Sequence, residues 1–179
     1  MDKRNKLTKQ IITSPSYQPR EEIENWFKTL RCEWEASKSC RQLHSLFTSI
    51  SIPSQISKIV GFACGTLLSS CQEQAADRVV FQHALILTLR DIVTNKQVES
   101  DPIRCHAQDP AYTEIDNSVL EGHGITVLKD PKGFLEVDDS TVVVSCAAAI
   151  PVKQIVSDLA RPAVIVWDRV SEDEPEQLL

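Results

Sequence analysis

Continuous apolar runs, each followed by a segment with helical periodicity, constrain the fold of this chain more than any other feature. The clearest run covers residues 141–146 and contains three consecutive valines, and residues 56–62 form a second run. Such runs are typical of strands covered on both faces, whereas strands with one solvated face alternate apolar and polar residues. The pattern therefore predicts a mainly parallel sheet between two layers of helices.

The other expected elements continue this alternation. We expect further strands at residues 103–107, 125–128 and 163–167, with a short extra strand at 134–137, and helices at 72–93, 112–122 and 151–159. Ser70 and Glu73 have capping-box spacing at the start of the first of these helices. The predicted fold class is α/β, a three-layer Rossmann-like domain with about five strands and an N-terminal helical segment.

The N-terminal helical segment carries an apolar stripe at helical spacing, formed by Ile23, Trp26, Phe27, Leu30 and Trp34. This stripe predicts a helix that packs on the domain through its tryptophans. The alternative is an adaptor whose tryptophans bind a protein partner. The expected organisation is a flexible basic tail (1–18), this helical segment (19–52), the α/β domain (53–170) and an acidic tail (171–179).

Charge and composition narrow the range of partners. The chain has 179 residues and a formal net charge of −6, and a nucleic-acid-binding domain normally presents a basic face. No apolar run approaches the roughly 20 residues that cross a bilayer. We therefore expect no nucleic acid and no membrane as partner.

Cysteine usage indicates the compartment. None of the six cysteines has CxxC spacing, and the basic start of the chain lacks the apolar run of a signal peptide. We expect reduced thiols, no zinc site and a cytoplasmic location, with the nucleus as the alternative. The sequence indicates no particular cofactor.

Ligands of open parallel sheets bind outside the carboxyl ends of the strands, which here selects the loops 61–70, 108–116 and 145–151. In the first loop, Gly61, Cys64 and Gly65 suit either an anion cradle built from backbone amides or a tight turn without a ligand. A thiol near a helix start can also have a lowered pKa, so Cys64 is a candidate nucleophile, although the sequence indicates no base to accept its proton. Ser145, in the third loop, is a candidate ligand-binding residue, although it lacks the context of a nucleophile elbow.

The second loop holds the other candidates. Asp109 suits either a ligand hydroxyl or a helix cap, and Thr113 and Asp116 suit capping as well. His106 ends the preceding strand, so His106 with Asp109 or Glu114 is a candidate acid–base pair. Tyr112 and Asp116 are candidate ligand-binding residues. His83, in a helix, is interpreted as a packed or surface residue, with catalysis as the alternative, and His123, in a turn, is assigned no role.

The segment Asp-Pro-Ala-Tyr-Thr-Glu-Ile-Asp at 109–116 resembles the signature of the family named for "sensitivity to red light reduced", the SRR-like domain family. Three flanking segments, at 59–65, 81–87 and 124–128, are similar to family segments in the same order, so the resemblance covers about residues 56–168. The family usually has Gly-x-Gly-Ser where this chain has Gly61-Phe62-Ala63-Cys64. It commonly has Pro-His-Cys after the valine strand, where this chain has Ser-Cys-Ala-Ala-Ala at 145–149.

The resemblance implies a regulatory or small-molecule-binding module with a pocket over the strand ends. Family members are linked to circadian and light signalling and to haem metabolism. The alternative is a cofactor-independent enzyme (an isomerase, cyclase or lyase) of a fungal secondary-metabolite pathway, using acid–base residues in the same pocket. Because the family histidine is missing, this chain either takes a different ligand or has lost an activity.

Overall fold

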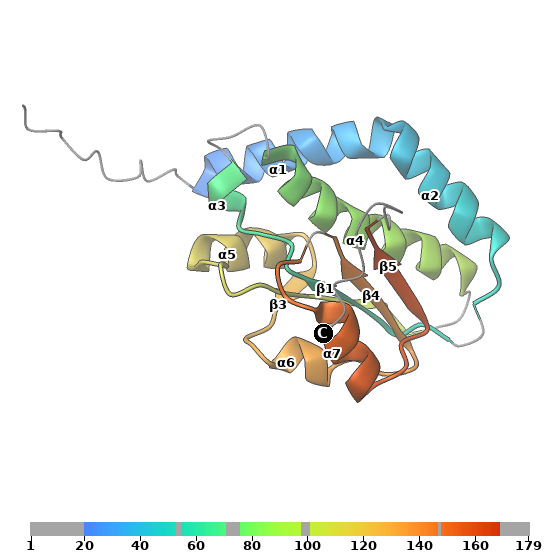
Figure 1. Cartoon of the computed structure of the whole chain (residues 1–179). Coiled ribbons are helices and arrows are strands. Elements are labelled where there is room, and N and C mark those ends of the chain that lie inside the picture. Colours follow the sequence, from blue (N-terminus) through green and yellow to red (C-terminus); the bar gives the residue numbers. More distant parts are fainter. Residues whose placement is uncertain (1–19, 53–54, 71–75, 98–100, 147, 169–179) are drawn as a thin grey trace, which may run out of the picture.

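Five parallel strands form one sheet in the computed structural model, which describes residues 20–52, 55–70, 76–97, 101–146 and 148–168 (Figure 1). The strands are β1 (Lys58–Phe62), β2 (Arg104–Gln108), β3 (Ile125–Val127), β4 (Thr141–Ser145) and β5 (Val164–Trp167). Their order in space is β3-β2-β1-β4-β5, and every neighbouring pair is parallel. The predicted fold class is confirmed.

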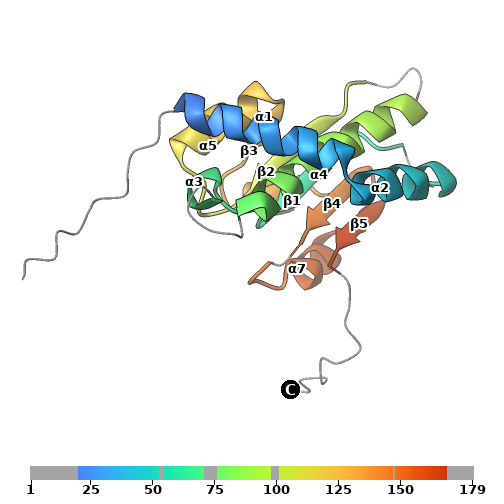
Figure 2. The same ribbon diagram turned by 90° about the horizontal axis from the view of Figure 1, so that it is seen from above.

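Helices cover both faces of this sheet. They are α1 (Arg20–Ala36), α2 (Lys38–Ser49), α3 (Leu67–Ser70), α4 (Ala76–Lys96), α5 (Glu114–Gly122), α6 (Lys132–Leu135) and α7 (Val152–Leu159). One face carries α4 and α5, with α1 and α2 running across α4, and the other face carries α6 and α7 (Figures 1 and 2).

The strands are apolar along their whole length because each contributes to both cores. In β1, Ile59 belongs to the core beneath α4, whereas Val60 and Phe62 belong to the core beneath α6 and α7. In β4, Val142 and Val143 divide between the cores in the same way. Successive side chains of a strand point to opposite faces, so a doubly covered strand needs apolar residues at every position.

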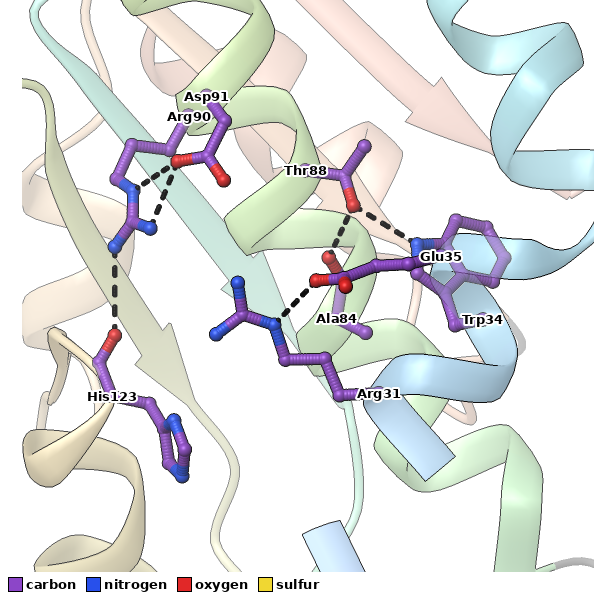
Figure 3. A network of polar contacts seen from close by, with 8 residues as sticks. All are labelled: Arg31, Trp34, Glu35, Ala84, Thr88, Arg90, Asp91 and His123. Carbon is purple, nitrogen blue, oxygen red and sulfur yellow. Dashed lines mark hydrogen bonds and ion pairs between the residues drawn. The ribbon is translucent and has the colours of Figure 1, made fainter. Parts of the chain in front are cut away.

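The helix α1 packs on the domain through its tryptophans, as the stripe predicts, and Trp34 contacts α4 directly. Trp26 and Trp34 are half-buried against the larger core, and the Trp34 Nε1 donates to Thr88 Oγ1 at 3.0 Å. The same hydroxyl donates to the carbonyl oxygen of Ala84 within α4, and Figure 3 shows both hydrogen bonds. These tryptophans are thus partly used in packing, and a protein partner of the helical segment stays a prediction.

Two local expectations were wrong. Residues 134–137 do not form a strand, because Phe134 and Val137 are both buried at helical spacing around α6 while Leu135 is 73% exposed. The short helix α3, which lies within the expected first loop, was not expected. The expected start of the long helix at residue 72, Glu73 of its capping box, and the 1–18 and 171–179 tails lie outside the described residues.

Candidate functional site

A cavity of about 480 Å³ opens at the carboxyl ends of the strands. The β1–β2 and β2–β3 connections cross on the face of α4 and α5, whereas the β3–β4 and β4–β5 connections cross on the face of α6 and α7. The chain therefore reverses direction between β1 and β4, where open α/β sheets bind ligands. All three expected loops reach this cavity, whose wall consists of Phe62, Ala63, Gly65, Gln108, Asp109, Pro110, Asp130, Phe134, Ala149 and Ile150.

The first and second loops are joined by Asp109. Its Oδ2 accepts the backbone N–H of Gly65 at 2.7 Å, and its Oδ1 accepts the N–H of Ala111 at 2.8 Å. Gly65 has φ of +81°, a left-handed conformation that favours glycine. The predicted proximity of the two loops is confirmed, since β1 and β2 are adjacent and parallel. Asp109 therefore binds the first loop instead of capping the next helix.

Asp116 ties the same two loops together more deeply. Its carboxylate accepts from Leu67 N at 2.7 Å and Thr66 Oγ1 at 2.8 Å, both in the first loop and the start of α3. It also accepts from the N–H and Oγ1 of Thr113, each at 2.7 Å, which completes the capping box of α5. Capping by these two residues is confirmed. Asp116 is fully buried, so it does not face the cavity.

The first loop is therefore an anion cradle that the chain itself fills. Its donors Gly65 N, Thr66 Oγ1 and Leu67 N bind the carboxylates of Asp109 and Asp116. Backbone amides in a strand–loop–helix connection usually bind a phosphate of the ligand. Here the acidic positions of the 109–116 motif take that place.

A buried polar chain lies behind this cradle. His83 is fully buried in α4, with Nδ1 at 2.7 Å from the Val79 carbonyl oxygen and Nε2 at 2.7 Å from the Tyr112 hydroxyl. A carbonyl oxygen only accepts, so Nδ1 carries the hydrogen and Nε2 accepts from Tyr112. Burial lowers the pKa of His83 to about 4 and raises the pKa values of Tyr112 and Cys64. Burial therefore favours the neutral form of each group, and the buried Cys64 does not have the lowered pKa that a helix start can give a thiol.

The opposite wall is held by Gln108, the last residue of β2. Its Nε2 donates to Asp130 Oδ1 at 2.8 Å, and its Oε1 accepts the N–H of Gly133 at 2.6 Å. A Cβ on Gly133 would lie 2.7 Å from that Oε1 and 3.0 Å from the Phe62 ring. The rings of Phe62 and Phe134 stack with centroids 4.5 Å apart. The wall is thus a fixed combination of aromatic surface, an amide and a carboxylate.

His106 does not meet Asp109, which corrects the expected acid–base pair. His106 is in register with Val60, so its ring points to the α6 and α7 face. Asp109 instead lies with Gly65 and near Cys64, which belongs to the core beneath α4. Burial lowers the pKa of His106, and neither of its ring nitrogens has a hydrogen-bond partner among the described residues.

The remaining candidates also lie outside the wall of the cavity. Gly61 is buried against α4, where a Cβ would lie 2.5 Å from Cδ1 of Ile86. Ser145 is fully buried at the end of β4, and Glu114 is exposed at the start of α5. Of the predicted site residues, Gly65 and Asp109 are the ones that line the cavity.

Sequence reasoning missed Gln108, Asp130, Phe134 and Ile150, all of which line the cavity. Gln108 carried a usable signal, because it ends a strand of the sheet directly before Asp109. Asp130 lies in the loop between β3 and α6, which was not among the three loops selected from the sequence.

Within the described residues, no group of three or more His, Cys, Asp or Glu side chains is arranged to hold a metal ion. In that same part of the chain, no helix combines the length and apolar character needed to span a bilayer. The described cysteines, Cys32, Cys40, Cys64, Cys105 and Cys146, are free thiols.

Comparison with known proteins gives one match. A family model described as "SRR1 domain" matches residues 41–178, which is most of the chain and includes every strand and the whole cavity wall. No curated protein and no solved structure matches the chain.

Proposed function

This chain belongs to the SRR1 domain family, and from this premise we propose that it is a regulatory module that binds a small molecule in the cavity at the strand ends. The observation that carries the proposal is the convergence of three loops on one cavity at the point where the strand order reverses. Its volume of about 480 Å³ falls within the roughly 300–1,000 Å³ typical of ligand pockets.

The chemistry of the wall supports binding over catalysis. An acid–base enzyme needs a proton donor and acceptor that reach one substrate. The titratable groups in the described wall are Asp109 and Asp130, and each already accepts at least one hydrogen bond from the chain. The buried His83 and the half-buried Tyr112 form a hydrogen bond with each other and are not part of the wall. This arrangement suits a rigid recognition surface better than a reacting centre.

A thermal-shift screen of the full chain tests the proposal, using nucleotides, haem, polyketide-like acids, and neutral and basic fragments as probes. A ligand specific to the folded state raises the melting temperature by mass action. We expect Ala149→Trp, which adds bulk to an exposed residue of the wall, to abolish that shift.

Leu159→Trp is the matched control, because Leu159 is an exposed residue of α7 outside the cavity wall. It should leave the shift unchanged. The proposal fails if no class of probe stabilises the protein, or if a stabilising probe acts equally on the Ala149→Trp variant.

A further inference from the structure

The charge of the cavity wall is one-sided. Among the described residues of the wall, Asp109 and Asp130 are carboxylates and none is Lys, Arg or His. The lysines nearest to Asp130 in sequence, Lys129 and Lys132, are exposed and are not part of the wall. An anionic ligand would therefore meet negative charge without a compensating cation in the described wall.

The backbone N–H groups of the first loop, which could bind an anion, already donate hydrogen bonds to carboxylates of the chain. Gly65 N donates to Asp109 Oδ2 and Leu67 N donates to Asp116 Oδ1, both at 2.7 Å. A phosphate would have to displace carboxylates that are covalently part of the chain, and one of them is fully buried. The strand–loop–helix connection thus disfavours the phosphate ligands that its position in the fold suggests.

The rest of the wall is apolar. Phe62 and Phe134 form a stacked pair, and Ala63, Pro110, Ala149 and Ile150 contribute further carbon surface. Ile150 is 50% exposed, so the apolar surface extends to the mouth of the cavity. Asp130 is also exposed, which leaves its carboxylate accessible to a ligand.

We infer, on the basis of the proposed function, that the cavity selects organic amines with an apolar or aromatic body and rejects phosphates and carboxylates. The ammonium group would lie between Asp109 and Asp130, and the apolar body would lie along Phe62, Phe134 and Ile150. Carboxylates attract an ammonium group and repel an anion, so the charge of the ligand decides its affinity.

Three probes of similar shape and different charge test this inference: 2-phenylethylamine, 2-phenylethanol and 3-phenylpropionate, with adenosine monophosphate as the phosphate probe. Each probe is titrated into the isotope-labelled full chain at neutral pH. Dissociation constants are taken from the changes in the NMR chemical shifts of the backbone amides of Gly65, Asp109 and Ala149. We expect the amine to bind roughly tenfold more tightly than either anion, and the alcohol to lie between them.

Asp130→Asn removes one charge and keeps an acceptor for Gln108. This substitution should weaken binding of the amine about fivefold and leave the affinity for the alcohol unchanged. Asp158→Asn removes the same charge from an exposed position of α7 and should change neither.

The outcomes separate the two proposals. The amine selectivity is overturned, while the binding function stands, if the amine, the alcohol and the anions bind with equal affinity. It is also overturned if Asp130→Asn changes the affinities for the amine and the alcohol equally. Tighter binding of an anion overturns the selectivity as well. Absence of cavity shifts with every probe counts against the binding function itself.

Discussion

Replacing Asp116 by alanine is the most informative perturbation, because this carboxylate joins the first loop to the start of α5. It accepts four hydrogen bonds of 2.7–2.8 Å from Thr66, Leu67 and Thr113. The side chain is fully buried, and so is Leu67. Alanine leaves the Leu67 and Thr113 N–H groups without their acceptor in a place that water reaches poorly.

The expected loss follows from these contacts. An orphaned buried donor costs about 1–3 kcal/mol, and loss of a helix cap costs about 1 kcal/mol. Thr113 is only half-buried, so relaxation recovers part of its cost. We expect the free energy of unfolding to fall by about 3–4 kcal/mol, a large share of the roughly 5–15 kcal/mol of a typical domain.

Urea unfolding followed by tryptophan fluorescence and circular dichroism measures this change. Asp116→Asn keeps one acceptor oxygen and should lose about half as much. Asp158→Ala removes an exposed carboxylate from α7 and should stay within about 0.5 kcal/mol of the parent protein. A loss below about 1 kcal/mol for Asp116→Ala, with an unchanged denaturant slope, would refute the idea that this carboxylate holds the loops together.

Three further predictions concern the same region. The folded-state pKa of His83 is about 4, below its ordinary 6.5, so the unfolded chain takes up the proton first. The contribution of His83 to the free energy of unfolding should be fully present above about pH 6.5, and up to about 3 kcal/mol of it should be lost as the pH drops towards 4. A urea midpoint that stays constant over this range, or that falls equally in the His83→Gln variant, contradicts this prediction. Ala63 has φ of +55°, so Ala63→Gly should raise the melting temperature by about 1–3 °C, and a lower value refutes the strain. Gly133→Ala should lower the free energy of unfolding in urea by about 1–3 kcal/mol, because its Cβ would lie 2.7 Å from Gln108 Oε1 and 3.0 Å from Phe62. An unchanged urea midpoint would contradict this, since it would mean that the neighbouring side chains move aside without cost.

The sheet was predictable because burial on both faces is a strong constraint on sequence. The expected strand at 141–146 corresponds to β4 (Thr141–Ser145), and the strand at 125–128 to β3 (Ile125–Val127). Short helical turns leave a weaker signal. The spacing of Phe134, in α6, and Val137, just beyond its end, fits one helical turn, yet over four residues it is hard to distinguish from a short strand.

The error over His106 has a simple geometric cause. Side chains alternate along an extended strand, so residues separated by three positions point to opposite faces. His106 and Asp109 have that separation, whereas His106 and Gln108 share a face. The alternation of side chains along the strand therefore argued against the His106–Asp109 pair, although the two residues are close in sequence.

The role of the 109–116 motif depended on information that periodicity does not contain. A carboxylate after a parallel strand can point outward to a ligand or sideways to the neighbouring loop, and both choices use the same residue type at the same position. The choice here follows from Gly65 and Leu67, whose N–H groups lie within 2.7 Å of Asp109 and Asp116. The fixed negative charge of the chain thus occupies the place of a ligand phosphate, and the cavity beside it inherits an acidic, partly apolar wall. Any ligand of this domain must be complementary to that wall, so we expect its chemistry to differ from that of the nucleotides bound by other folds with this strand order.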